Sequence, residues 1–329
     1  MEYFSELNLV GRSPAFLGAL SLVRKFATCD ATVLVQGETG TGKELAARAI
    51  HYLGLRRGFP FIPVNCGALP DSLVENELFG HVRGAYTDAR DNQRGLVSDA
   101  EGGTLFLDEI EALSPRAQVV LLRFLQDRTY RPLGGRSQLN GNVRIIAASN
   151  FELAELVRSG GFREDLLYRL AILTLRMPAL RERPGDPFML AKHFIGRFAT
   201  QYERPARELD RQTIDLLATH CWPGNVRELE NEIHRAFLLA DGGSIRLTAS
   251  WENKSMPIDD HSGALTDFPF HEAKAHALAE FERAYIDQLL ERSRGNVSLA
   301  ARISGKERSR LSKLIKKHGI VRNHYTGEA

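Results

Sequence analysis

The 329-residue sequence has few cysteines, little net charge and no long apolar run. Its three cysteines, Cys29, Cys66 and Cys221, are odd in number and far apart, which argues against a disulfide framework or a zinc site. The longest apolar stretch, near 119–122, is far below the ~20 residues that span a bilayer. The first residues lack the basic and then apolar pattern of a secretion signal. We therefore expect a cytoplasmic protein with inert thiols and no membrane partner.

Net charge is nearly absent because 43 Lys+Arg oppose 41 Asp+Glu, leaving +2. The segment from Arg292 to Arg322 nonetheless carries ten basic residues and one acid, Glu307, for a net charge of +9. Once Glu328 in the tail is included, residues 1–291 carry −6. An acidic body with a basic end predicts that the end binds a polyanion.

The composition, 43% hydrophobic and 26% charged, excludes a wholly disordered, collagen-like or coiled-coil chain. Over residues 8–176, short continuous apolar runs alternate with helical stretches. This pattern predicts an α/β unit with parallel strands that are buried on both faces. The expected strands are Thr32–Val35, Phe61–Val64, Thr104–Leu107 and Val143–Ala148.

The rest of the chain is expected to be helical or irregular. Apolar residues recur at helical spacing after the α/β unit, for example Ile214, Leu217, Leu229 and Ile233. The expected divisions are a tail (1–7), the α/β unit (8–176), a helical unit (177–247), a linker (248–272) and a small C-terminal helical domain (273–329).

The most specific motif is Gly37-Glu38-Thr39-Gly40-Thr41-Gly42-Lys43-Glu44, which follows one expected strand and opens a helix. Its glycines let backbone N–H groups wrap phosphates, and Lys43 is placed to meet the β and γ charges. A flexible glycine-rich turn is the alternative. The generic motif ends in Ser or Thr, which holds magnesium, whereas this one ends in Glu44. Magnesium binding is therefore expected to depend more on a second acidic motif.

That second motif is the pair Asp108-Glu109 at the end of an apolar strand. Asp108 can hold hydrated Mg²⁺, and Glu109 can orient or deprotonate the attacking water. Alone, such a pair is usually just a strand end entering a loop. Together with the glycine-rich loop it predicts hydrolysis of ATP with Mg²⁺ as the cofactor.

Together with further motifs, these residues make the chain resemble the AAA+ domain of bacterial enhancer-binding proteins, the ATPases that activate RNA polymerase carrying sigma-54. The resemblance spans about Leu9–Leu247. It rests on GETGTGKE at 37–44, Asn65-Cys66, ELFGH at 77–81, GAYTDA at 84–89, GGTLFLDE at 102–109, FREDL at 162–166 and WPGNVREL at 222–229. It implies an AAA+ P-loop ATPase, with a parallel sheet between helices on both faces and a helical lid. In that family Glu44 is the usual residue after the lysine.

The resemblance also implies individual roles. Asn65 would hold Glu109 between turnovers, and Ser149 and Asn150 would read the γ-phosphate. Arg163 and Arg169 would reach the ATP of a neighbouring subunit. Arg227 would sense the nucleotide from the lid, and Val10 and Gly11 would contact the nucleotide. The alternatives are a surface arginine for Arg163, ion-paired helix residues for Arg169 and Arg227, and turn-forming asparagines. An arginine supplied in trans makes catalysis depend on assembly, which predicts a homo-oligomer, from a dimer up to a hexameric ring.

The loop that touches sigma-54 in typical members, GAFTGA, here reads Gly84-Ala85-Tyr86-Thr87-Asp88-Ala89. Tyr keeps an aromatic contact, whereas Asp adds a charge and removes the tolerance of glycine for positive φ. We favour a variant loop that still engages sigma-54. The alternative is a DNA-binding regulator whose ring does not engage sigma-54 and which acts on another polymerase form or as a repressor. An AAA+ chaperone would not explain the basic end.

The C-terminal segment predicts helices over about Val297–Ile303 and Glu307–His318, separated by a glycine-containing turn, as in a helix-turn-helix. It resembles the Fis-type domain over about Ala284–Ile320. This implies double-stranded DNA, at upstream enhancer sites, as a partner. The candidate DNA contacts are Arg308, Ser309 and Ser312 for base edges and Lys313 and Lys317 for phosphates, with Arg310 also able to face DNA. A solvated basic helix is the alternative. Leu278, Phe281, Tyr285 and Leu289 form either a dimer seam or an intradomain core.

About eight residues precede the AAA+ resemblance. We therefore expect no N-terminal regulatory domain, and control in trans by a separate inhibitory protein or by expression level.

Overall fold

The computed structural model of the protein describes residues 7–71, 73–86, 89–240, 244–247, 286, 289–290, 293, 296–304 and 308–317. The chain divides into two compact units, residues 1–247 and 248–329. The expected linker, 248–272, lies outside the described residues. Among the helices that the structure describes, none is both long enough and apolar enough to cross a membrane.

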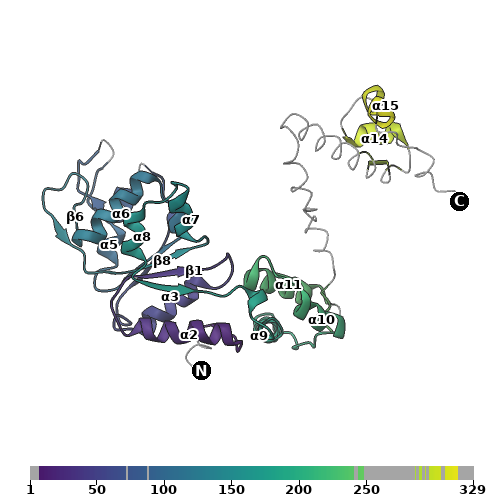
Figure 1. Ribbon diagram of the computed structural model, residues 1–329, viewed down its shortest axis with the longest axis horizontal. Helices are drawn as coiled ribbons and strands as arrows, with labels where there is room; N and C mark the ends of the chain where they lie inside the picture. Colours follow the sequence, from purple (N-terminus) through teal and green to yellow (C-terminus); the bar gives the residue numbers. More distant parts are fainter. Residues whose placement is uncertain are drawn as a thin grey trace. The chain divides into compact units, whose positions relative to one another are not determined.

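A five-stranded parallel sheet lies at the centre of the first unit, in the order β2-β5-β8-β1-β9 (Figure 1). The strands are β1 (Val33–Gln36), β2 (Phe61–Asn65), β5 (Thr104–Asp108), β8 (Arg144–Ser149) and β9 (Leu173–Arg176). The first four match the predicted strands within one residue at each end. The fifth was not predicted because it is an edge strand in which only Leu175 is fully buried, so it has no continuous apolar run.

Helices cover both faces of this sheet. Helices α2 (Pro14–Ala27) and α3 (Lys43–Tyr52) lie on one face, and α6 (Pro115–Asp127) and α8 (Glu164–Leu170) on the other (Figure 1). Successive side chains of a strand point to opposite faces, so Leu105 and Leu107 pack into one core and Phe106 into the other. Because both faces are covered, the strand ends and the loops that follow them are the parts left for function.

Two hairpins extend from this α/β core. One contains β3 (Gly80–His81) and β4 (Gln93–Arg94), and the other contains β6 (Thr129–Tyr130) and β7 (Leu139–Asn140). Val82 N donates to Leu133 O at 3.0 Å, and Leu133 N donates to Gly80 O at 2.9 Å, which joins the hairpins. The remaining short elements are η1 (Cys66–Ala68), α4 (Val74–Phe79), α5 (Leu96–Asp99), η2 (Ile110–Ala112) and α7 (Leu153–Arg158).

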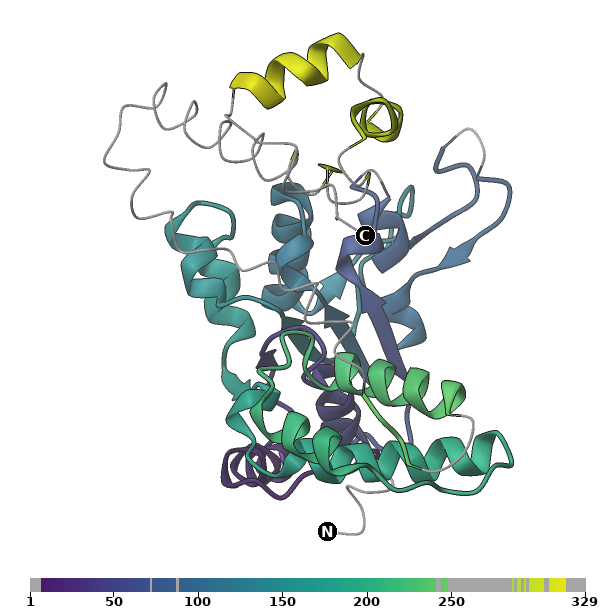
Figure 2. The same cartoon turned by 90° about the vertical axis from the view of Figure 1, so that its right-hand side faces the viewer.

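A helical lid completes the first unit. It contains η3 (Leu180–Glu182), α9 (Asp186–Gln201), α10 (Arg211–Thr219) and α11 (Asn225–Leu239), drawn in green in Figure 2. Leu217, Leu229 and Ile233 lie in its core as their spacing predicts, whereas Ile214 is 39% exposed and does not. The predicted fold class, an AAA+ sheet between helices with a helical lid, is confirmed.

A buried ion pair ties the N-terminal segment to the lid. Arg183 Nε lies 2.8 Å from Asp186 Oδ2, and both side chains are 2% exposed. Asp186 also accepts hydrogen bonds from Arg12 N, Ser13 N and Ser13 Oγ, while Arg183 donates to Val10 O at 2.8 Å. These hydrogen bonds compensate the burial of two charges, which is otherwise costly.

In the second unit, α14 (Val297–Ser304) and α15 (Arg308–Lys317) pack around a small apolar core. Asn296 caps α14 by accepting hydrogen bonds from Ser298 N and Leu299 N. Leu289 is buried in this core, which favours the intradomain alternative for that residue. The other members of the predicted seam, Leu278, Phe281 and Tyr285, lie outside the described residues. The predicted all-α helix-turn-helix domain is confirmed.

Candidate functional site

The glycine-rich loop joins β1 to α3 at the carboxyl edge of the sheet, where an anion can meet the N-terminus of a helix. Gly42 precedes α3 with φ +94, in the region that glycine adopts without strain. Gly40 has φ +80 and lies against the lid, because a Cβ at Gly40 would come within 2.3 Å of Gly224 O. The loop thus needs glycine both for its turn and for its approach to the lid.

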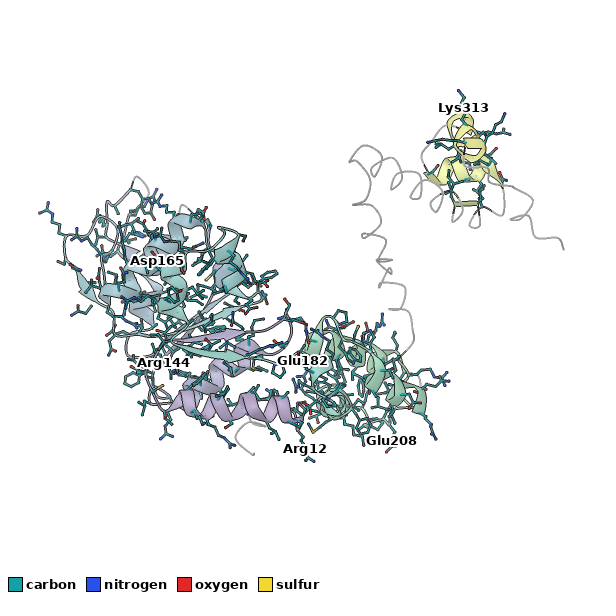
Figure 3. All side chains as sticks on the ribbon, viewed as in Figure 1. Arg12, Arg144, Asp165, Glu182, Glu208 and Lys313 are labelled. Carbon is teal, nitrogen blue, oxygen red and sulfur yellow. The ribbon has the colours of Figure 1, made fainter. Side chains whose placement is uncertain are left out.

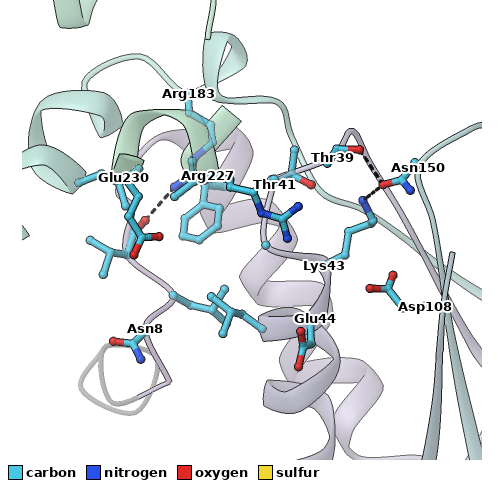
Figure 4. A pocket seen from close by; sticks show the side chains of 18 of the residues that line it. Asn8, Thr39, Thr41, Lys43, Glu44, Asp108, Asn150, Arg183, Arg227 and Glu230 are labelled. Carbon is cyan, nitrogen blue, oxygen red and sulfur yellow. Dashed lines mark hydrogen bonds between the residues drawn. The ribbon is translucent and has the colours of Figure 1, made fainter. Parts of the chain in front are cut away.

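Lys43 is held at the end of this loop. Its Nζ donates to Gly37 O at 2.7 Å, to Glu38 O at 3.0 Å and to Asn150 Oδ1 at 2.7 Å (Figure 4). Burial lowers the pKa of the Lys43 ammonium, whereas the nearby charge of Asp108 raises it. The ammonium therefore lies where phosphate charge would compensate its lost hydration.

Asp108 and Glu109 follow β5 in the same cluster. Burial raises the pKa of Asp108, and the Glu109 N–H, which donates to Asp108 Oδ1 at 3.0 Å, lowers it. Glu109 has φ +52 and ψ +46, a left-handed conformation that costs a non-glycine residue about 1 kcal/mol or more. Such strain is concentrated at functional sites because it aims a side chain where a relaxed backbone would not.

Asn65, the predicted partner of Glu109, ends the neighbouring strand and pairs in register with Asp108. Its Oδ1 accepts a hydrogen bond from Gly67 N at 2.8 Å. A Cβ at Gly67 would lie 3.1 Å from Glu109 Oε2 and 3.2 Å from Asn65 Oδ1. The two side chains therefore converge on Gly67, but among the described residues the hydrogen bond of Asn65 goes to that backbone and not to Glu109.

Asn150 lies at the end of β8, and its Oδ1 accepts hydrogen bonds from Lys43 and from Thr39 Oγ1. Ser149 is buried and bonds the backbone of Phe151, so it shapes the turn. Glu111, which the sequence interpretation missed, accepts the Asn150 N–H at 2.9 Å through Oε1. No motif marks Glu111, because its role depends on the approach of η2 to β8.

Several of these residues line a cavity of about 240 Å³ (Figure 4). The loop residues 39–44, with Asp108, Glu109 and Asn150, supply polar groups to its lining, and so do Asn8, Arg183, Arg227 and Glu230. Apolar side chains that the sequence interpretation missed, from Leu9, Phe16, Leu190 and Val226, line it together with the predicted Val10. The predicted contacts Gly11, Gly37, Glu38 and Ser149 are not among the lining residues. Glu38 instead turns toward the lid, and Gly11 packs against Phe16, Arg183 and Asp186.

The three predicted arginines have different surroundings. Arg227 lines the cavity from α11 and is exposed, and Arg169 is exposed on α8. Neither forms an ion pair with any residue that the structure describes, contrary to the ion-paired alternative. Arg163, by contrast, forms an ion pair with Asp165 at 2.7 Å. Arg163 and Arg169 are not among the residues that line the cavity.

The variant loop begins in the first hairpin. Gly84 N donates to Ala89 O at 2.8 Å, which closes the base of the loop. Tyr86 is 44% exposed, and its ring lies 5.0 Å from that of His81, which is buried. Thr87 and Asp88, where the substitution of glycine falls, lie outside the described residues.

In the second unit, Arg308, Lys313 and Lys317 are exposed, and Lys313 projects outward (Figure 3). Ser312 is half-buried, while Leu311 and Ile315 are buried on the opposite side of α15. The side chains of Ser309 and Arg310 lie outside the described set. A basic surface thus remains on α15 once its apolar side has packed.

Family models match three consecutive parts of the chain: a sigma-54 interaction domain over residues 9–176, an AAA+ ATPase lid domain over 181–250, and a bacterial regulatory protein of the Fis family over 277–318. The chain belongs to the sigma-54-dependent transcriptional regulators. It is a sigma-54-dependent transcriptional activator that combines an AAA+ ATPase with a DNA-binding helix-turn-helix domain.

Relatives and solved structures agree with this assignment. The transcriptional regulatory protein GlrR of Escherichia coli is 42% identical over 96% of this chain and 69% of its own length. The DNA-binding transcriptional regulator NtrC of Azospirillum brasilense is 39% identical over 96% of this chain and 70% of its own. The crystal structure of NtrX from Brucella abortus with ATP has a TM-score of 0.69 at 31% identity, covering 94% of this chain and 69% of that one. The predicted nucleotide-binding ATPase is thereby confirmed.

Proposed function

We propose that the cluster at the carboxyl edge of the sheet hydrolyses Mg²⁺-bound ATP, and that an oligomeric ring of these subunits uses the reaction to remodel sigma-54 polymerase at a promoter. The observation that carries the proposal is the bonding of Lys43 to the loop carbonyls and Asn150, beside Asp108 and Glu109, in a cavity that apolar side chains also line. Such a cavity fits an adenine at one end and a triphosphate at the other.

The residues divide the chemistry between them. The backbone N–H groups of the loop and Lys43 bind the β- and γ-phosphates, and Asn150 positions Lys43 and contacts the γ-phosphate. Glu109, set by its left-handed backbone, accepts a proton from the attacking water. Asn65, whose side chain converges with that of Glu109 on Gly67, would take up the Glu109 carboxylate between turnovers.

The carboxylates near the phosphate loop are suited to bind magnesium together with the phosphates of ATP. Asp108 is a half-buried carboxylate whose pKa is raised by burial, so a cation would stabilise its ionised form. Glu44, which also lines the cavity, is paired through Oε1 with Arg48 at 2.6 Å. The described residues contain no group of three or more His, Cys, Asp or Glu able to hold a metal alone. This agrees with Mg²⁺, which binds one or two carboxylates together with phosphate oxygens. When bound, it would neutralise charge on the phosphates.

Assembly follows from the arginines. Arg169 is exposed and has no ion partner in the described part of the chain, and Arg163 is the N-cap residue of the same short helix. We propose that they stabilise the transferring phosphate of a neighbouring subunit, which requires a ring, up to a hexamer. Arg227 would complete the site from the lid of the same subunit.

The loop at 84–89 is proposed to contact sigma-54 through Tyr86, which His81 holds at the surface. In the second unit, Arg308, Ser309 and Ser312 are proposed to read base edges, while Arg310, Lys313 and Lys317 bind phosphates at upstream sites. These proposed partners support a cytoplasmic location, which we also propose.

Open-complex formation by sigma-54 polymerase on a promoter with upstream sites tests this proposal. The full-length protein with ATP should open the promoter, and Asp88→Gly should retain or increase the rate. ATP hydrolysis without any opening in either version would favour the alternative, a regulator whose ring does not engage sigma-54. Opening of promoters by a polymerase without sigma-54 would contradict the proposal outright.

A further inference from the structure

The acidic side chain of the phosphate loop faces the lid. Glu38 Oε2 accepts a hydrogen bond from Arg181 Nη1 at 2.7 Å, and Glu38 Oε1 accepts one from Arg181 Nη2. Two guanidinium N–H groups thus meet two carboxylate oxygens, the fork-to-fork geometry of strong charge-assisted pairs. Residues 143 positions apart in sequence are joined in this way.

Asn225 forms a second bridge at the same place. Its Nδ2 donates to Glu38 Oε2 and to Thr39 O, each at 3.1 Å, and its Oδ1 accepts a hydrogen bond from Leu180 N at 2.7 Å. Asn225 is fully buried and has φ +54, a conformation that Asn tolerates better than most residues. A buried amide with each of its polar atoms bonded across a junction fixes the geometry of that junction.

The backbone adds a third contact. Val226 N donates to Gly40 O at 3.0 Å, where Gly40 leaves no room for a Cβ. Consecutive loop residues, 38–40, are therefore bonded to the start of η3 and the start of α11. Arg227 follows directly in α11 and reaches the cavity.

We propose that Glu38, Arg181 and Asn225 are positioning residues that form a loop–lid link, which sets the position of Arg227 at the nucleotide. The inference rests on the proposed role of Arg227 in hydrolysis. A displacement of the phosphate loop is transmitted by the link to the first turn of α11, and movement of the lid is transmitted back to the loop.

The charge of Glu38 supports this coupling between the phosphate loop and the lid. The hydrogen bonds from Arg181 and then from Asn225 lower the pKa of Glu38 to about 2, so the side chain is an anion at neutral pH. An anion in a phosphate-binding loop repels a triphosphate unless a cation neutralises it. Arg181 both neutralises Glu38 and attaches it to the lid.

A double-mutant cycle on the full-length protein tests the link. Arg181→Gln, Arg227→Ala and the double variant are compared for kcat and KM of ATP hydrolysis and for the dissociation constant of ADP. We expect Arg181→Gln to lower kcat/KM about tenfold, and the double variant to lose little beyond Arg227→Ala alone, because a misplaced Arg227 has already lost its effect. Arg181→Lys should fall between, since it keeps a charge but not the fork.

Arg176→Gln is the matched control. Arg176 is an exposed arginine that acts on Glu38 only at longer range and pairs with Glu182. It should leave kcat/KM within about twofold, whereas an effect equal to that of Arg181→Gln would overturn a specific link. Thermal unfolding confirms that each variant is folded.

The outcomes distinguish the loop–lid link from the proposed role of Arg227. If Arg227→Ala lowers activity and the two effects multiply fully in the double variant, the link is overturned while the role of Arg227 stands. If Arg227→Ala alone leaves both hydrolysis and ADP affinity unchanged, the proposed role of Arg227 fails, and the link fails with it.

Discussion

Lys43 Nζ lies 2.7 Å from Asn150 Oδ1, so the residue that opens α3 is bonded directly to the residue that follows β8. Both residues also contact the glycine-rich loop. Lys43 donates to carbonyl oxygens of the loop, and Asn150 accepts a hydrogen bond from Thr39. A change in what Lys43 binds therefore alters the bonding of Asn150. Under the proposed mechanism, this bond would let the strand end register whether a γ-phosphate is present.

Replacing Asn150 by Ala should impair hydrolysis more than binding. The variant removes one of the three acceptors of Lys43 and the proposed contact to the γ-phosphate, but leaves the glycine-rich loop and the apolar lining of the cavity intact. We expect kcat to fall on the order of 10²-fold and ADP affinity to change by only a few fold. Phosphate release and calorimetry measure the two quantities. Asn140→Ala, at an exposed strand end, is the control, and equal losses in both variants would refute the assignment.

Glu109→Gln keeps the shape of the side chain but cannot accept a proton. We expect kcat to fall by roughly 10²–10⁴-fold with nucleotide affinity retained, because general-base catalysis contributes about that much. Glu152→Gln, an exposed glutamate before α7, should have no such effect. A single-turnover rate for Glu109→Gln equal to that of the wild type would show that another residue acts as the general base.

Arg169→Ala should inactivate the assembled protein without weakening nucleotide binding to the isolated subunit. An arginine supplied in trans contributes roughly 10³–10⁵-fold in rate. Mixing Arg169→Ala subunits with Lys43→Ala subunits should restore part of the activity, because some interfaces then combine an intact loop with an intact arginine. Arg158→Ala, which removes another exposed arginine, is the control. If no mixture recovers activity, the arginine does not act across an interface.

The contribution of the Glu38–Arg181 pair to stability should depend on acidity in one direction. The pKa of Glu38 is lowered to about 2 from 4.5. A carboxyl group whose pKa is lower in the folded state stabilises the fold above its unfolded pKa and loses this effect as the pH falls. The difference in thermal unfolding temperature between the wild type and Glu38→Gln should therefore be constant from pH 8 to 6. It should shrink as the pH falls through 4.5 toward 2, and a difference that grows on acidification would be inconsistent with the pair.

Lys313→Ala should weaken DNA binding equally for all sequences. If Lys313 meets a phosphate, its loss should reduce the slope of log affinity against log salt by about one unit. Fluorescence anisotropy at several salt concentrations measures this on specific and unrelated duplexes. Lys192→Ala, in the lid, should leave the slope unchanged. A change in sequence preference with an unaltered slope would place Lys313 at a base edge.

The sequence predicted the parts of the site that lie in continuous motifs. The loop at 37–44, the acids after β5 and four of the five sheet strands follow from local patterns, since buried parallel strands and phosphate loops have specific local sequences. Glu111 and Asn225 could not be assigned in the same way. Each acts on a backbone brought near only by tertiary packing, and Asn225 meets Glu38 across 187 positions of sequence. The edge strand β9 was not predicted because one of its faces is exposed to solvent.

The buried pair of Arg183 and Asp186 has a mechanical meaning. The pair fastens Val10 and Ser13 to the lid, but Ser13 is also the N-cap residue of α2, and Leu9 and Phe16 pack in the core on the sheet. The segment 9–16 therefore couples the lid to the sheet beside the cavity. A displacement of the lid would reach the helix that covers the sheet without passing through the phosphate loop.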